Sequence, residues 1–206
     1  MPNWCTNIVE IAHKDPAKLK EVVEAYNEGK FCNFAKPVPK ELQIVAGRVG
    51  SNEEYAQQLL EFTEQLNMKF FGYKHWYDFC VNEWGTKWDV GGDGDKVELE
   101  EDQTDTTFDF CSAWSPPIGA YEALLEQGFE VRAYYYEPGM AYAGIWDNGD
   151  DNYYEIGGET SETIKEAIPE ELDEMFVISE TMAEYEDMEA NEEYNHSLDD
   201  ANAKDH

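Results

Sequence analysis

The sequence has few basic residues and no long apolar run. It holds 14 Lys and Arg residues against 46 Asp and Glu residues, a net charge of -32 at pH 7. A surface of this sign repels phosphate groups, which argues against direct binding to nucleic acid. The chain also lacks the roughly 18 consecutive apolar residues of a membrane-spanning helix. Its start, MPNWCTN, has neither the basic nor the apolar region of a signal peptide. We therefore expect a protein of the cytoplasm that does not engage a membrane.

Signatures of catalysis are also scarce. The four cysteines form no C-x-x-C pair, and only four histidines occur. The sequence contains no P-loop, dinucleotide fingerprint, G-x-S-x-G or H-E-x-x-H motif. One alternative is a zinc site, although the spacing of its candidate ligands matches no known signature: Cys5, Cys80, Cys111 and His75. We expect buried thiols instead, with no metal, no cofactor and no catalytic residue, which favours a non-enzymatic protein.

Apolar residues alternate or recur at helical spacing through most of the chain. Alternation predicts strands over residues 3–13, 96–102, 106–114 and 129–139. Spacings of three and four residues predict helices over 14–30, 52–68 and 115–128. The helix at 52–68 carries an apolar stripe: Tyr55, Leu59, Phe62 and Leu66. An extra hairpin is predicted over 141–156, with its turn on Asp147-Asn148-Gly149.

The order of these elements predicts an α+β fold. It matches the split β-α-β frame of a ferredoxin-like antiparallel sheet over residues 1–158. Residues from about 31 to 95 would form a helical, aromatic-rich insertion between the first helix and the second strand. Residues 159–206 would form an acidic C-terminal extension, partly helical and then loose.

Three of the six tryptophans lie in the stretch HWYDFCVNEWGTKWDV, His75 to Val90. One interpretation is an aromatic pocket for a small planar ligand, lined by Asn82, Trp84, Lys87, Trp88 and Asp89. The favoured interpretation is that the segment closes a small core, because aromatic side chains bury large areas. Lys87 and Asp89 would then form an ion pair or anchor the turn at Gly85.

The strand RAYYYE raises the possibility of RNA binding through a sheet surface. Tyr134 and Tyr136 would stack bases beside Arg132, as on other ferredoxin-like sheets. Few basic residues are present to hold a nucleic-acid backbone, so we expect the hairpin and the C-terminal extension to pack over this face.

The C-terminal extension concentrates the negative charge. Residues 159–206 hold 17 acidic residues and 2 lysines. A helical stripe predicts that the first part packs on the domain: Leu172, Met175, Phe176, Met182 and Tyr185. After about Glu186, too few apolar residues remain to offset the entropy cost of ordering the chain. The carboxylates expected to contact a partner are Glu170, Glu171, Asp173, Glu174, Glu184, Glu186 and Asp187.

Three motifs together resemble a known family. They are NWCTN near the N-terminus, WYDFCVNEWGTKWD in the middle and AWSPP before the helix predicted at 115–128. The combination is similar to phage- and plasmid-borne proteins with a YubB-type ferredoxin-like domain, a domain of unknown function. The resemblance covers roughly residues 1–158 and implies the fold and a mobile-element origin. It implies no activity, cofactor or catalytic residue.

Three functions are consistent with these features. The first, which we favour, is a non-enzymatic accessory protein of a phage or mobile element. Its acidic surface would bind a basic host protein, with carboxylates in place of nucleic-acid phosphates, and so block a DNA-binding or defence protein. The second is a small-ligand binder or enzyme that uses the tryptophan pocket. The third is a structural component that assembles with itself; nothing in the sequence sets the oligomeric state.

Overall fold

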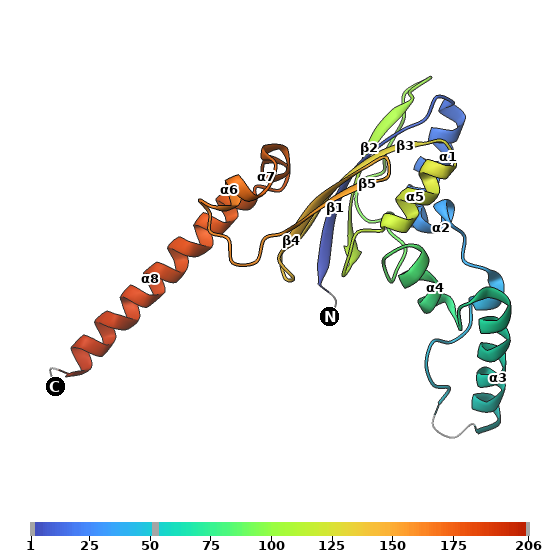
Figure 1. Ribbon diagram of the computed structural model, residues 1–206, viewed down its shortest axis with the longest axis horizontal. Coiled ribbons are helices and arrows are strands. Elements are labelled where there is room, and N and C mark those ends of the chain that lie inside the picture. Colours follow the sequence, from blue (N-terminus) through green and yellow to red (C-terminus); the bar gives the residue numbers. More distant parts are fainter. Residues whose placement is uncertain (1–2, 51–53, 205–206) are drawn as a thin grey trace.

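The centre of the structure is a sheet of five antiparallel strands. The structure is a computed structural model that describes residues 3–50 and 54–204, with side chains described as far as Glu192. The strands lie in the order β2-β1-β3-β4-β5. Their bounds are β1 (Trp4–Ala12), β2 (Asp105–Ala113), β3 (Glu130–Glu137), β4 (Tyr142–Asp147) and β5 (Asp150–Glu155). Helices pack on both faces of the sheet (Figure 1), so the chain has the α+β fold that the sequence predicts.

The helices fall into three groups. One face of the sheet is covered by α1 (Pro16–Asn27), α2 (Phe31–Ala35) and α5 (Ile118–Glu126). The insertion continues with a 3-10 turn (Lys40–Leu42), α3 (Glu54–Phe71) and α4 (Trp76–Glu83). The C-terminal extension forms α6 (Ile164–Ala167), α7 (Glu170–Phe176) and α8 (Ile178–Lys204). None of these described helices is long and apolar enough to cross a membrane.

The arrangement around β1 is the split β-α-β unit that the element order predicts. Strands β2 and β3 flank β1, and both run antiparallel to it. They are therefore parallel to each other, and α5 connects them across β1. Val9 shows the register, because it lies opposite Phe108 on β2 and Ala133 on β3. The predicted hairpin then extends the sheet as β4 and β5.

The strand predicted over residues 96–102 does not form, so this prediction was wrong. The side chain of Asn27 pairs with the backbone of Val97 instead. Its Nδ2 donates to the Val97 carbonyl at 2.9 Å, and its Oδ1 accepts from the Val97 N–H at 2.9 Å.

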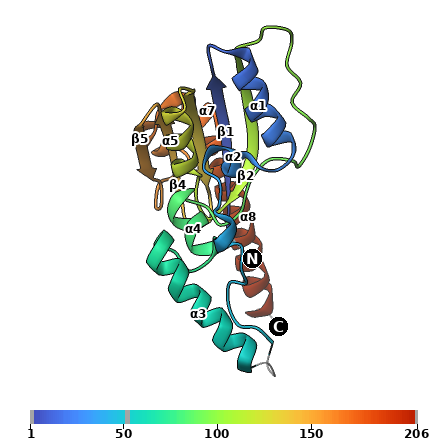
Figure 2. The same ribbon diagram turned by 90° about the vertical axis from the view of Figure 1, so that its right-hand side faces the viewer.

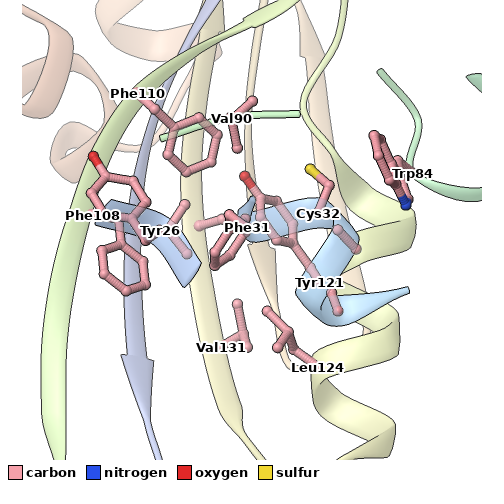
Figure 3. Close-up of a cluster of buried hydrophobic side chains, with 14 of the residues drawn as sticks. Tyr26, Phe31, Cys32, Trp84, Val90, Phe108, Phe110, Tyr121, Leu124 and Val131 are labelled. Carbon is pink, nitrogen blue, oxygen red and sulfur yellow. The ribbon is translucent and has the colours of Figure 1, made fainter. Parts of the chain in front are cut away.

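The main core lies between the sheet and the layer of α1, α2 and α5. The alternation of β1 holds as predicted, with one set of residues buried on this side: Cys5, Asn7, Val9 and Ile11. Phe31 of α2 packs between Tyr26 and Phe108 on one side and Tyr121 on the other (Figure 3). Its ring centroid lies 5.5 Å from that of Phe108. The short helix α2 thus places the ring of Phe31 between α1 and α5.

The opposite face of the sheet is covered by the C-terminal helices, as the sequence predicts. Tyr134 is buried there, and the ring of Tyr136 lies 5.7 Å from that of Phe176 in α7. Arg132 donates from Nη2 to both carboxylate oxygens of Glu171 at 2.9 Å. The RAYYYE strand thus presents no open aromatic face to RNA, while the hairpin extends the sheet rather than covering it.

Helix α8 continues to Lys204, past the point at which the sequence predicts loose chain. A second core lies between the C-terminal helices and the face of the sheet that carries Tyr134. Ile178 and Met182 pack into it, but Tyr185 of the predicted stripe is exposed. Every residue from Glu184 to Glu192 is exposed. Figure 1 shows this helix projecting away from the sheet.

Helix α3 forms over nearly the predicted range, although residues 52 and 53 lie outside the described residues. Its apolar stripe does not face the domain: Tyr55, Leu59, Phe62 and Leu66 are all exposed. Only Leu60 and Asn67 of this helix are buried. In both ribbon views α3 lies beyond α4, away from the sheet (Figure 2).

A glycine in β4 lets a core tyrosine lie flat on the sheet. A Cβ atom at Gly144 would lie 2.2 Å from the ring of Tyr135. We expect Gly144→Ala to lower the free energy of unfolding by about 1–3 kcal/mol, because the ring must move out of a packed core. Gly157→Ala is the control, since its added Cβ meets only Ala141 at 3.6 Å, and it should change stability by less than about 0.5 kcal/mol. Urea unfolding followed by circular dichroism measures both; equal stability of the two variants would contradict this packing.

Candidate functional site

The tryptophan segment begins as a short helix that closes the insertion against the core. His75 caps α4 by accepting the Asp78 N–H on Nδ1 at 3.4 Å, and Phe79 and Cys80 face inwards. Trp84 is 3% exposed, and its Nε1 donates to the Lys36 carbonyl at 2.8 Å. In Figure 3 it stands at the end of the buried cluster, beyond Cys32. Trp84 is therefore a core residue rather than the wall of a pocket.

Asp89 anchors helix α2 through its carboxylate. Oδ1 accepts from the Cys32 N–H at 2.7 Å, and Oδ2 accepts from the Asn33 N–H at 3.2 Å. Burial raises the pKa of this carboxyl, and the backbone hydrogen bonds offset part of the rise. Burial also raises the pKa of the Cys32 thiol well above its usual value, and the charge of Asp89 adds to that rise. Asp89 thus anchors the start of α2, whereas its expected anchor point was the turn at Gly85.

The five residues predicted to form a ligand pocket do not converge. Lys87 makes no ion pair with Asp89 within the described structure; its Nζ lies 4.3 Å from the ring centroid of Trp88. Asn82 lies on the exposed side of α4 and donates to a carbonyl of its own helix at 2.7 Å. Trp88 and Asp89 line a hollow of about 600 Å³ together with Trp4. The ring centroid of Trp4 in β1 lies 6.2 Å from that of Trp88, so β1 supplies an aromatic neighbour of this segment.

The end of the tryptophan segment is joined to the AWSPP turn after β2. Thr86 Oγ1 donates to the Ala113 carbonyl at 3.0 Å and accepts the Ala113 N–H at 3.1 Å. The Gly119 N–H donates to the Trp84 carbonyl at 3.1 Å. The tryptophan segment and the AWSPP turn are therefore in direct contact and form one buried junction.

A second hollow, of about 570 Å³, lies beside this junction, and its lining is mainly aromatic: Trp114, Tyr135, Met140, Tyr142 and Tyr153, with Asp151. Trp114 has a φ of 73°, a conformation that side-chain-bearing residues rarely adopt. Its carbonyl accepts from the Tyr142 hydroxyl at 2.7 Å, and Tyr135 donates to Asp151 Oδ1 at 2.6 Å. No local pattern marks this hollow, because its residues come from separate strands and turns.

Part of the predicted acidic surface is used within the molecule. Glu171 pairs with Arg132, Asp173 Oδ1 accepts from the Ser179 N–H at 2.7 Å, and Glu186 accepts from the N–H and hydroxyl of Ser161. The hydrogen bonds from Ser161 lower the pKa of Glu186. The remaining predicted partner-facing carboxylates are exposed: Glu170, Glu174, Glu184 and Asp187.

The zinc alternative is not realised among the side chains that the structure describes, residues 3–50 and 54–192. No group of three or more His, Cys, Asp and Glu residues there is placed to hold a metal ion. Cys5 lies opposite Ser112 on β2 and is buried, whereas the neighbouring Cys111 is exposed on the other face of the sheet. The two thiols therefore point to opposite sides. Burial raises the pKa values of Cys5 and Cys80 to about 12, so both remain protonated thiols at neutral pH.

Comparison with known proteins identifies a distant structural neighbour. No family model matches the sequence, and no curated protein matches it. A crystal structure of a protein api92 from Yersinia pseudotuberculosis, described with the family model DUF1281, aligns with a TM-score of 0.40. The alignment has 12% sequence identity and covers 77% of this chain and 99% of that chain. A likeness of this extent carries no argument about function.

Two tryptophans of the segment should differ sharply in their contribution to stability. Trp84→Ala removes a buried indole and leaves the Lys36 carbonyl unpaired, so we expect a loss of about 3–5 kcal/mol in the free energy of unfolding. Trp88→Ala removes a partly exposed ring and should cost less than about 1 kcal/mol. Circular dichroism in urea at constant salt provides the comparison. A larger loss for Trp88→Ala would show that the wrong tryptophan has been assigned to the core.

Proposed function

We propose that this chain is a non-enzymatic binding protein that engages a basic protein through its acidic C-terminal helices. The density of exposed carboxylates on α8 carries the proposal. Six acidic residues lie in the 13 residues from Glu180 to Glu192, which is one per about 3 Å at the rise of an α-helix. One strand of DNA carries one phosphate per about 3.4 Å. The linear charge density of α8 is therefore similar to that of one DNA strand.

The charge pattern of α8 favours a cationic partner. Glu180 and Glu184 are four residues apart, and like charges at this spacing destabilise a helix. No lysine or arginine occurs between Ile178 and Ala203 to compensate. A basic surface laid along the helix would remove this repulsion. Such contacts associate quickly and weaken as salt rises.

The identity of the partner follows from the same chemistry. Carboxylates that stand in for phosphates suit a protein that normally binds nucleic acid. With the mobile-element origin that the motif resemblance implies, the partner would be a DNA-binding or defence protein of the host, met in the host cytoplasm.

The aromatic hollow at Trp114 supports a second candidate function, binding of a small ligand. Its volume of about 570 Å³ lies in the range of ligand sites, and the φ of Trp114 is of the kind that clusters at binding sites. Saturable quenching of tryptophan fluorescence by a planar ligand, absent in Trp114→Phe, would support it.

Neutralising carboxylates on α8 should weaken capture of basic proteins from a host lysate. The test variant combines Glu180→Gln, Glu184→Gln, Asp187→Asn and Glu189→Gln. The matched control changes net charge equally at exposed sites elsewhere, through Asp93→Asn, Asp95→Asn, Glu98→Gln and Glu100→Gln. At low salt we expect the α8 variant to bind about tenfold more weakly than the control variant, equivalent to about 1.4 kcal/mol.

Two outcomes would contradict the proposed function. One is equal loss in both variants, which would mean that net charge alone retains the captured proteins. The other is capture by the unaltered chain that recovers no basic protein at low salt. Duplex DNA added as competitor should displace the partner if the carboxylates occupy its nucleic-acid site.

A further inference from the structure

The apolar stripe of α3 is an unusually exposed surface for so polar a chain. Because α3 extends to Phe71, Phe70 continues the stripe as a fifth member. The five members expose large fractions of their areas: Tyr55 80%, Leu59 55%, Phe62 57%, Leu66 40% and Phe70 72%. Contiguous apolar patches of this kind mark interaction sites on soluble proteins.

The stripe faces away both from the domain and from the glutamates of its own helix. At about 100° per residue, its five members fall within an arc of about 80°. Leu60 and Asn67, which the domain buries, lie about 120° around the helix from the centre of the stripe. The glutamates Glu54, Glu61 and Glu64 lie about 120–160° from that centre. The stripe is therefore free of carboxylates as well as uncovered.

The surrounding chain is electrically neutral. Residues 36–74 hold five acidic and five basic residues, in a protein whose net charge is -32. Another copy of this chain is strongly repelled elsewhere but meets little repulsion here. A cationic partner, by contrast, gains nothing from this part of the surface.

The order of residue types along the stripe is nearly the same in both directions. Its order is aromatic, leucine, phenylalanine, leucine, aromatic, from Tyr55 to Phe70. If two copies of α3 pair antiparallel across a two-fold axis near Phe62, Tyr55 faces Phe70 of the second copy. Leu59 then faces Leu66 of the second copy. Such self-complementarity is what a two-fold symmetric interface requires.

We propose that α3 is a homodimerisation surface that pairs antiparallel with α3 of a second copy of this chain. Because fully covered aromatic side chains bury 150–250 Å² each, the exposed fractions of the five residues amount to about 600 Å² per copy. If the pairing covers all five side chains, the total of about 1,200 Å² reaches the lower end of stable protein interfaces. Helices α3 and α8 lie at opposite ends of the long axis (Figure 1), so this pairing leaves the acidic helix open.

The salt dependence of the dimer should oppose that of the basic-partner contact. Salt screens the repulsion between two acidic chains, so the dimer dissociation constant should fall when ionic strength rises from about 0.05 M to about 0.5 M. Sedimentation velocity of the full chain at several concentrations measures it. A monomer at about 100 μM protein in high salt overturns the proposal, since an interface of this size should be occupied there.

Charge substitutions test the antiparallel register. Leu59→Lys alone and Leu66→Glu alone each place a charge against an apolar residue and should raise the dissociation constant at least about tenfold. The double variant Leu59→Lys/Leu66→Glu places opposite charges face to face twice by symmetry, and should recover part of the loss. Failure of the double variant to dimerise better than both single variants overturns the proposed pairing.

Met68→Lys is the matched control. Met68 is exposed on the same helix, but about 160° from the centre of the stripe, so its substitution should leave the dissociation constant unchanged. Circular dichroism of every variant confirms that it is folded. Equal weakening by Met68→Lys and Leu59→Lys would overturn the assignment to the stripe. The binding of basic proteins by α8 is measured separately and can fail without affecting this result.

Discussion

The junction between the tryptophan segment and the turn after β2 holds the insertion to the sheet. Thr86 exchanges two hydrogen bonds with Ala113, and the Gly119 N–H bonds to the Trp84 carbonyl. A side chain at Gly119 is excluded, because its Cβ would lie 2.2 Å from the Glu83 carbonyl oxygen. Since this close approach fixes α4 against α5, it also sets where α3, which ends five residues before α4, meets the domain. The buried position of Trp84 and the outward position of α3 both depend on it.

Charge is distributed unevenly between α8 and the segment around α3. Closely spaced, exposed carboxylates recur along α8 as far as Glu192, where they repel one another. The segment 36–74 balances its charges and exposes apolar area instead. On the two proposals, a basic partner would bind at α8 and a second copy of the chain at α3. Rising salt would weaken the first contact and strengthen the second.

Much of the fold could be predicted from local patterns, because they report which face of an element is buried. The alternation at Val9 and the turn at Asn148-Gly149 appear in the structure as predicted. The strand expected at 96–102 does not form, although its expected neighbour β2 lies at the edge of the sheet. The side chain of Asn27, 70 residues away in the sequence, hydrogen-bonds to the N–H and the carbonyl of Val97, which a strand would have paired with its neighbour.

By itself, the sequence determined the composition-level properties: an acidic protein, an α+β pattern, and an aromatic segment suited to a core. These follow from charge counts and from periods of two and about four residues, which need no knowledge of distant contacts. Only the tertiary structure decided that Trp84 is buried while Trp88 is not, and that the stripe centred on Phe62 faces outward. Periodicity shows that a helix has an apolar side. Whether that side is buried depends on which other part of the chain packs against it. In α3 the domain packs against Leu60 and Asn67 instead of the stripe.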